Sequence, residues 1–188
     1  MDNSLFAPFA VRSATSLERI VANDDSYLQS DDSAFCALTD FRREYPITVQ
    51  SNASIDDALG EMNRFGVHAL LVTQDEAGEL NSQIVGLITA YDIERHRPHR
   101  SPNSHDLKPG KPTTVCDVMT PWNELSLVKY ESLQALTAVD IYKMFQGTGL
   151  THLLVVELDG DDSAVLRGLL SRAALAKRLT RSRTGRSR

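Results

Sequence analysis

Two related stretches of the sequence decide the fold. The first, HALLVTQDEAGELNSQIVGLITAYD, runs from His68 to Asp92, and the second, HLLVVELDGDDSAVLRGLLSRAA, runs from His152 to Ala174. Each stretch contains two apolar runs of strand length separated by a polar segment. Continuous apolar runs of this kind are typical of strands that are buried on both faces. Each stretch is therefore predicted to form two buried strands that lead into a helix.

Shorter strings show that this repeat extends further along the chain. ALTDF at 37–41 corresponds to VMTPW at 118–122, and SIDDAL from Ser54 corresponds to SLQAL from Ser132. HALLV at 68–72 corresponds to HLLVV at 152–156, and GLIT at 86–89 corresponds to GLLS at 168–171. Four matches in the same order, at nearly constant spacing, indicate a duplicated unit. The small drift in this spacing predicts a longer first helix in the second copy.

The first copy is predicted to run strand, helix, strand, strand, helix. A strand over 46–50 leads to a helix with Ser54 as its N-cap, since Asp57 completes a capping box and Gly66 suits the end. After the two apolar strands, a second helix is predicted from Thr89 until the proline at position 98 stops it.

The second copy is predicted to repeat this order. A strand over 125–130 comes first, and a helix follows from Ser132 to Gly147 or Gly149. The last helix is predicted from Ser171 to about position 179.

The ordered, duplicated strings resemble a tandem pair of CBS (cystathionine β-synthase) domains. The residues that carry the resemblance are VMTP at 118–121, the strand pairs HALLV/GLIT and HLLVV/GLLS, and GLITAYD at 86–92. The resemblance covers about residues 34–180. It implies an α+β fold in which two CBS domains pack pseudo-symmetrically as a Bateman-type regulatory module, in a disc-like homodimer. It also implies an adenosine-containing ligand, such as AMP, ADP or ATP, bound in the cleft between the two copies.

The resemblance and the composition together divide the chain into five parts. We expect an N-terminal extension at 1–33, a first CBS domain at 34–98, a connector at 99–114, a second CBS domain at 115–180, and a basic, disordered tail at 181–188. The connector is rich in proline, serine and basic residues, which is typical of a loop or linker.

The strand-to-helix turn GLITAYD is the strongest candidate for a ligand site. Gly86 allows close approach of another backbone, and Thr89 lies where free N–H groups at a helix start can attract an anion. Asp92, one turn later, can accept hydrogen bonds from both hydroxyls of a ribose. By resemblance, Thr89 and Asp92 match the Gly-x-x-Thr/Ser-x-x-Asp nucleotide motif of the family. Thr-x-x-Asp is also a helix-capping pattern, and the two roles are compatible.

Three further residues of the first copy are candidates for contact with the base or phosphate. Ile47 and Val49 match positions that line the adenine slot in the family, although plain core packing explains them equally well. Tyr91 can stack on a base or cover the helix end. The family often has an arginine at the position that Tyr91 occupies, so phosphate binding is less secure than ribose binding.

The second copy departs from the nucleotide motif. Its version of the turn keeps Gly168 and the hydroxyl of Ser171 but has Ala174 in place of the aspartate. Alanine cannot bind a diol, so we expect one good ligand site per chain. Arg172 can contact a phosphate there, or it can simply be solvated or paired with an acidic residue.

Composition and charge exclude several other classes of protein. The chain has 188 residues, 41% hydrophobic and 24% charged, which is ordinary for a globular protein. No apolar run is long enough to span a bilayer, and no secretory signal is recognised. Two cysteines are too few for a disulfide framework. A cytoplasmic location is therefore expected. The net charge of −5 combines −4 for residues 1–33, −8 for residues 34–171 and +7 for residues 172–188.

These observations lead to two main hypotheses. The first is a regulatory module that binds an adenine nucleotide or a related adenosine ligand and acts through a homodimer or an effector protein. The alternative is a degenerate pair without a ligand that serves as a dimerisation or scaffold module. No nucleophile–base pair, Walker loop or dinucleotide fingerprint is present, so no enzyme is expected. We also expect no required cofactor, no metal, no membrane binding and no sequence-specific nucleic-acid recognition; the basic tail allows, at most, non-specific tethering to nucleic acid.

Overall fold

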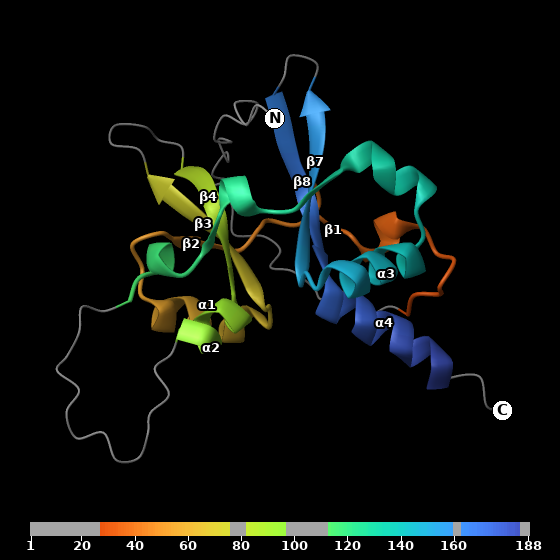
Figure 1. The fold of residues 1–188 in the computed structure, drawn as a ribbon, viewed down its shortest axis with the longest axis horizontal. Helices are drawn as coiled ribbons and strands as arrows, with labels where there is room; N and C mark the ends of the chain where they lie inside the picture. Colours follow the sequence, from red (N-terminus) through yellow and green to blue (C-terminus); the bar gives the residue numbers. More distant parts are fainter. Residues whose placement is uncertain (1–26, 76–81, 97–112, 160–162, 185–188) are drawn as a thin grey trace. The chain divides into compact units, whose positions relative to one another are not determined.

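The computed structural model describes residues 27–75, 82–96, 113–159 and 163–184 (Figure 1). The elements are 3-10 helices (η), α-helices and β-strands. In chain order they are η1 (Ala34–Ala37), β1 (Thr39–Asp40), β2 (Thr48–Gln50), α1 (Ile55–Phe65), β3 (Ala69–Asp75), β4 (Ser82–Thr89), α2 (Ala90–His96), η2 (Val115–Asp117), β5 (Thr120–Pro121), η3 (Trp122–Glu124), β6 (Leu127–Lys129), η4 (Tyr130–Ala135), α3 (Ala138–Thr148), β7 (His152–Asp159), β8 (Ser163–Ser171) and α4 (Arg172–Thr184).

These elements form two sheets with the same internal plan. One sheet has the order β2-β3-β4-β5, and the other has the order β6-β7-β8-β1. In each sheet the first two strands are parallel, and the central pair is antiparallel with a bulge near its middle. The predicted α+β fold and the order strand, helix, strand, strand, helix are confirmed for both copies.

The edge strand of each sheet comes from the other half of the sequence. β1 belongs to the first copy but pairs with β8, and β5 belongs to the second copy but pairs with β4. Among the described residues, one compact unit accordingly contains 27–45 and 126–184, and the other contains the described parts of 46–125. These units cross the sequence repeat, and the five-part division of the chain stays a prediction.

A glycine makes room for each edge strand. A Cβ atom at Gly86 would lie 2.6 Å from the carbonyl oxygen of Thr120, and one at Gly168 would lie 2.3 Å from that of Thr39. Both distances are far below normal van der Waals contact. The close approach that the sequence predicted at Gly86 is therefore made by the chain's own backbone.

The first helix of each copy begins with the same capping arrangement. The Ser54 hydroxyl accepts a hydrogen bond from the Asp57 amide at 3.0 Å, and α1 ends at Gly66 with φ of 66°, as predicted. The equivalent cap of α3 is Thr137, whose hydroxyl accepts from the Asp140 amide.

The predicted start of this helix at Ser132 is wrong, because Ser132 lies in η4. Both α1 and α3 have 11 residues, so the prediction of a longer helix in the second copy is wrong as well. The extra residues of the second copy form the 3-10 helix before the cap. Pairing Ser54 with Thr137 instead of Ser132 brings the spacing of the two caps into line with that of the other matched strings.

The second helices of the two copies differ in length. α2 covers seven residues after Thr89, and the proline expected to stop it lies outside the described residues. α4 covers 13 residues and continues to Thr184, beyond the end predicted near Leu179. No glycine or proline interrupts the sequence before position 185, so nothing in the local sequence stops the helix earlier.

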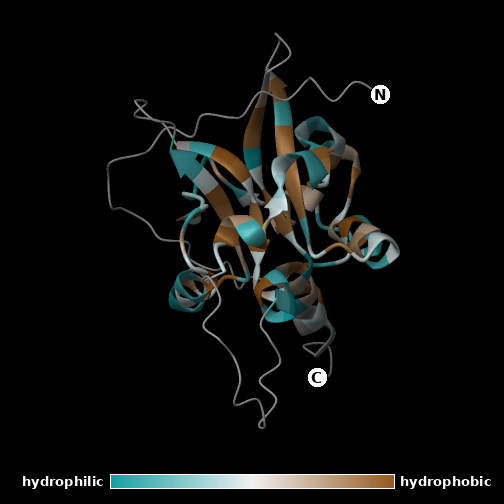
Figure 2. Cartoon of the chain, turned by 60° about the vertical axis from the view of Figure 1, so that its left-hand side comes forward, coloured by the Kyte–Doolittle hydropathy of each residue, from teal (hydrophilic) through white to brown (hydrophobic). Residues whose placement is uncertain are grey.

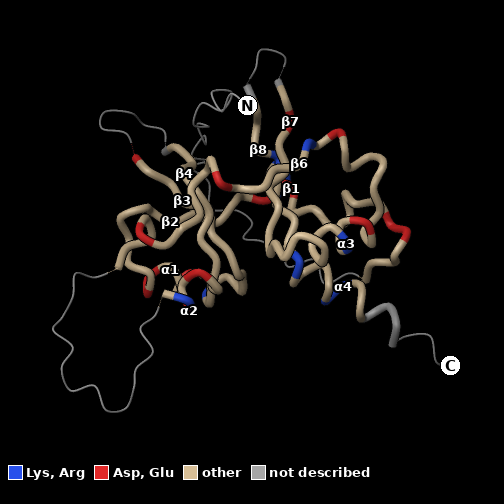
Figure 3. Tube along the Cα trace, viewed as in Figure 1, with Lys and Arg blue, Asp and Glu red and all other residues tan. Residues whose placement is uncertain are grey.

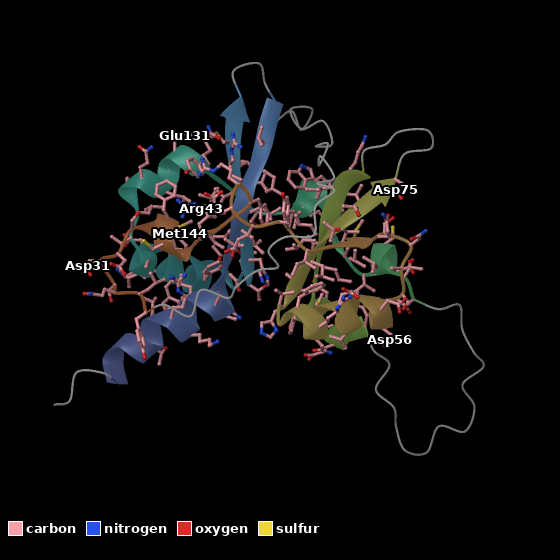
Figure 4. All side chains as sticks on the ribbon, turned by 180° about the vertical axis from the view of Figure 1, so that it is seen from behind. Asp31, Arg43, Asp56, Asp75, Glu131 and Met144 are labelled. Carbon is pink, nitrogen blue, oxygen red and sulfur yellow. The ribbon has the colours of Figure 1, made fainter. Side chains whose placement is uncertain are left out.

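Each unit has its own apolar core between its sheet and its helices. The core of the first copy contains Met62 of α1, Val72 of β3 and Ile93 of α2, and the core of the second contains Phe145 of α3 and Leu175 of α4. Figure 2 shows the strands as the most hydrophobic elements. Consecutive residues of β3, β4 and β7 are buried, as the apolar runs predicted, whereas β8 has both buried and half-buried residues. Asp75, labelled in Figure 4, lies at the end of β3, and its carboxylate accepts hydrogen bonds from the Gln50 side chain.

The segment before η1 completes the core of the second copy, a role that the sequence did not reveal. Leu28 is 2% exposed, and its amide donates to the carbonyl oxygen of Arg178 in α4. The carbonyl oxygens of Ser30 and Asp32 accept from the first two amides of α3. This segment therefore satisfies helix-end donors that would otherwise lack partners.

Within the described residues, no helix has both the length and the apolar character of a membrane-spanning segment.

Candidate functional site

Thr89 and Asp92 form a reciprocal hydrogen-bonded pair where β4 ends and α2 begins. The Thr89 hydroxyl donates to Oδ2 of Asp92 at 2.6 Å, and the Thr89 amide donates to the same oxygen at 3.0 Å. In return, the Asp92 amide donates to the Thr89 hydroxyl at 3.2 Å. Thr89 is buried and Asp92 is half-buried. The structure thus forms the capping arrangement that was one of the two interpretations of this motif.

The hydroxyl-to-carboxylate hydrogen bond of this pair also occurs at three other helix starts. The cap hydroxyl donates to Oδ2 of the aspartate three residues later at 2.6 to 2.7 Å in Ser54/Asp57, Thr114/Asp117 and Thr137/Asp140. Capping geometry alone therefore does not mark Asp92 as a ligand residue. Within the part of the chain that the structure describes, the hydrogen bonds of the Asp92 carboxylate all use Oδ2. Capping consequently leaves Oδ1 for another donor.

The start of α2 offers an anion fewer backbone donors than the sequence predicted. The Ala90 amide donates to the carbonyl oxygen of His68 at 3.0 Å, and the Asp92 amide is held by Thr89. Two of the three amides in the first turn therefore already have partners. An anionic group on a ligand at this site must be met mainly by side chains.

The structure places the other predicted residues of the first copy in the same unit. Val49 of β2 and Gly86 of β4 lie on either side of Val72 in one row of the sheet. Val49 is buried and Ile47 is half-buried, and both pack against the core of this unit. Both residues therefore take part in core packing, which was one of the two interpretations of them. Tyr91 is 58% exposed, and its ring lies 5.7 Å from the guanidinium carbon of Arg95.

The corresponding turn of the second copy lacks the carboxylate. The Ser171 hydroxyl accepts only a long hydrogen bond of 3.5 Å from the Ala174 amide, and Ala174 is exposed. Arg172 is half-buried, and its amide donates to the carbonyl oxygen of Thr151, as Ala90 does with His68. The two turns therefore have similar backbone hydrogen bonds, but only the first has an aspartate three residues after its hydroxyl residue.

A cluster that the sequence did not reveal fixes the segment after β1. Arg42 donates from Nε and Nη2 to the Asp40 carboxylate at 3.0 and 2.9 Å, and it also donates to the Tyr130 hydroxyl. Its guanidinium lies 4.8 Å from the centroid of the Tyr130 ring. The hydrogen bonds from Arg42 hold the pKa of Asp40 below its ordinary value. The cluster ties this segment to the start of η4, and no local sequence pattern predicts such a long-range contact.

Comparison with known proteins identifies the family. Residues 38–99 match the sequence model of the CBS domain. The chain therefore contains a CBS domain. The second half repeats the strand pairing and first-helix cap of this domain, so the two sheets are consistent with a tandem CBS pair.

Several solved structures are similar to this CBS pair. An uncharacterised conserved protein from Pyrococcus horikoshii is 17% identical, with 86% of this chain and 97% of that chain covered and a TM-score of 0.50, which supports the fold. A crystal structure of a CBS domain is 27% identical over 72% of this chain and 89% of that chain, with a TM-score of 0.47. The CBS-pair protein CBSX2 from Arabidopsis thaliana, crystallised in complex with AMP, is 21% identical over 82% and 99% of the two chains, with a TM-score of 0.49. No curated protein matches the sequence.

Proposed function

We propose that this CBS pair is a regulatory module that binds an adenosine-containing ligand, with Thr89 and Asp92 as the ribose-binding residues. The observation that carries the proposal is the orientation of the Asp92 carboxylate. Thr89 fixes Oδ2 with two hydrogen bonds, so that Oδ1 is available to a ribose hydroxyl. A carboxylate is an acceptor only, and a vicinal diol offers two donors close together.

The remaining candidates complete the site. Ile47, which is half-buried, supplies apolar surface for adenine, and Val49 lies in the same row of the sheet as Gly86 and supports that surface. Tyr91 supplies an exposed ring next to Asp92. Ser171 and Arg172 form the corresponding turn of the second copy, where Ala174 removes the diol acceptor. One strong ligand site per chain follows from this difference.

The module acts by responding to its ligand and performs no catalysis in this proposal. A ligand changes the conformation only if it binds two conformations with different affinity. We propose that a homodimer or an effector protein responds to the change. No cofactor, metal, membrane or specific nucleic acid takes part, and the proposed location is cytoplasmic. In the described parts of the chain, no three His, Cys, Asp or Glu side chains form a metal-binding group.

Isothermal titration calorimetry tests the proposal with AMP, ADP, ATP, NAD and S-adenosylmethionine. We expect one of these ligands to bind the wild type and to bind Asp92→Ala at least about ten times more weakly, since a hydrogen bond to a charged group contributes about 1.5–3 kcal/mol. Asp57→Ala is the matched control, because it removes the same capping carboxylate from α1 of the same unit. Its ligand affinity should equal that of the wild type. Absence of binding at millimolar concentration, or equal binding by Asp92→Ala, contradicts the proposal.

A second candidate function is a scaffold module without a ligand. Two observations favour it: Asp92 has the geometry of three other caps, and Ala174 removes the acid in the second copy. This candidate predicts a stable dimer in analytical ultracentrifugation and no thermal shift with any nucleotide of the panel. A nucleotide-dependent thermal shift that Asp92→Ala abolishes would exclude it.

A further inference from the structure

Helix α4 continues beyond the apolar residues that pack it against its unit. Leu175 is buried in the core of the second copy, and Leu179 packs partly against that core. Positions 180–188 contain only threonine, serine, arginine and one glycine. The helix nevertheless extends to Thr184, and its C-terminal end lies away from the sheet of its unit (Figure 1). Apolar burial therefore explains the first part of α4 but not its last turn.

The charge at this end of the chain has one sign. Residues 172–188 include seven basic residues and no acidic one, and in Figure 3 the described part of α4 carries basic positions only. Lys177 is exposed and lies two residues from each of the two leucines, which places it on the opposite side of the helix. Position 181, an arginine, lies one turn further along the same side. We call the side that carries Lys177 and Arg181 the basic face of α4.

Two hydrogen bonds fix the start of this face to the fold. The Leu28 amide donates to the carbonyl oxygen of Arg178 at 3.3 Å, and Nη1 of Arg178 donates to the carbonyl oxygen of Cys36 at 2.7 Å. Both partners belong to the segment that precedes β1. A helix that is held in this way presents its charges in one fixed direction, so that binding through it costs less ordering entropy than binding through a flexible tail.

The chemistry of α4 favours duplex nucleic acid as the partner. A duplex carries about one negative charge per 1.7 Å of its axis, which is the strongest regular match to a one-signed basic face. A helix that binds a membrane inserts an apolar face, and the leucines of α4 are already used by the core. Proteins that bind single strands stack bases on aromatic side chains, and residues 172–188 contain no aromatic residue.

The acidic body of the protein confines such a contact to this end. Residues 34–171 have a net charge of −8, which repels a phosphate backbone. Acids of the described elements are also held locally, since Asp40 is paired with Arg42 and Asp57 accepts from the cap hydroxyl of α1. They lie on separate elements and do not form a row of charges as regular as that of a duplex.

We infer that the basic face of α4 binds the phosphate backbone of duplex nucleic acid without sequence preference. Lys177 and Arg181 contact phosphates, and Arg178 anchors the helix that carries them. The inference goes beyond the proposed function and does not rest on it, because Thr89 and Asp92 belong to the other compact unit.

Fluorescence anisotropy with a labelled DNA duplex of about 20 base pairs tests the inference on the full chain. We expect the wild type to bind at about micromolar concentration in about 50 mM salt, and equally for two duplexes of unrelated sequence. Lys177→Gln/Arg181→Gln should reduce the slope of log K against log salt by about two, because each phosphate contact contributes about 0.9 to that slope.

Two control variants separate the basic face from total charge. Arg64→Gln/Lys143→Gln also removes two exposed basic side chains, from α1 and α3, and should keep the slope and affinity of the wild type. Arg181→Ser/Ser182→Arg keeps the composition and charge but moves one base away from the side that carries Lys177. This exchange should reduce the slope by about one.

Several outcomes would overturn the inference. They are absence of duplex binding by the wild type in about 50 mM salt, and a salt slope that neither Lys177→Gln/Arg181→Gln nor the exchange of positions 181 and 182 changes. Binding to vesicles of phosphatidylglycerol and phosphatidylcholine without binding to the duplex would overturn it in favour of a membrane. Asp92→Ala should bind the duplex as the wild type does, so a failure of the proposed ligand site and a failure of this inference are distinguishable.

Discussion

The two copies share their first helix and differ at their second. α1 and α3 start with equivalent hydroxyl–aspartate caps and end at left-handed glycines. α2 starts with Thr89 and Asp92, whereas α4 starts with Ser171 and an alanine three residues later. The difference separates what the fold needs from what a ligand needs, since the same strand-to-helix turn exists with and without the acid.

Helix α4 shows that this turn does not need a carboxylate in order to form. It has 13 residues against seven in α2, and Leu175 is buried in the core of its unit. Packing of apolar residues therefore stabilises α4 without the cap. The acid at Asp92 is the chemical feature that distinguishes the first copy, which is why the proposed ligand site lies there.

The largest expected effect concerns a feature that the two copies share, the glycine that lies against the backbone of each edge strand. Gly168→Ala and Gly86→Ala should each lower the free energy of unfolding by about 1–3 kcal/mol, because the new Cβ would strike the backbone of β1 or β5. The effect should be larger at Gly168, where the contact would be 2.3 Å against 2.6 Å at Gly86. Urea unfolding of the purified variants measures the change.

Each of these variants has a control in its own unit. Gly147 of α3 and Gly60 of α1 have nothing within 4 Å of an added Cβ, so alanine there should stabilise the protein by up to about 1 kcal/mol. Loss of stability at Gly147 as large as at Gly168 would show that the cost does not come from the edge strand. The shared role of the two glycines would then be wrong.

The parts of the fold that local signals determine could be predicted from the sequence. Ser54, Asp57 and Gly66 mark both ends of α1, and the structure has the helix there. The second copy was misaligned because SLQAL resembles SIDDAL in its apolar letters. A search for the hydroxyl–aspartate pair instead would have found Thr137 and Asp140 at the spacing of the other repeats.

Features that depend on contacts far apart in the sequence could not be predicted. Nothing near Leu28 indicates that it packs against α4, and nothing near Thr39 indicates that β1 pairs with β8 rather than with its own copy. Gly86 and Gly168 carried a partial signal, since a glycine inside a buried strand indicates close approach of another backbone. The candidate site shows the same limit. The sequence spacing of Tyr91 and Arg95 allows a contact between their side chains, but it does not show that the contact forms.

A smaller effect is expected from restoring the missing acid of the second copy. Ala174→Asp should give Ser171 the partner that Thr89 has in Asp92, and should raise the free energy of unfolding by about 0.5–1 kcal/mol. If the proposed function holds, the variant should also add a second nucleotide equivalent per chain in calorimetric titrations. These two results together would show that the aspartate accounts for the difference between the second copy and the first.

Ala173→Asp separates the cap from simple helix electrostatics. It places the same charge in the same turn of α4, but one residue away from the position that faces the cap hydroxyl. This control should gain only a few tenths of a kcal/mol and no second ligand. Equal stabilisation by both variants would mean that the charge matters and the capping geometry does not.

The smallest effect concerns the acid sensitivity of the cap of α3. Hydrogen bonds from the Thr137 hydroxyl and amide lower the pKa of Asp140 below its ordinary value, and Lys143 adds to this effect. A carboxyl whose pKa is lowered by folding contributes stability above its unfolded pKa, and this contribution is lost as the pH falls through the folded value. The free energy of unfolding should therefore decrease from about pH 4 downward, and Asp140→Asn should show a shallower decrease.

Two substitutions of the cap residue decide whether this pH dependence comes from the hydroxyl. Thr137→Ser keeps the oxygen that donates to Asp140 and should keep the slope of the wild type, whereas Thr137→Val removes it and should have the shallow slope of Asp140→Asn. Urea unfolding from about pH 5 to about pH 2 measures all four proteins. Because Thr137→Val also removes a helix cap, its stability falls at every pH, and only the slope is informative. A wild-type slope in Thr137→Val would assign the lowered pKa of Asp140 to Lys143 and the backbone amide, and not to the hydroxyl.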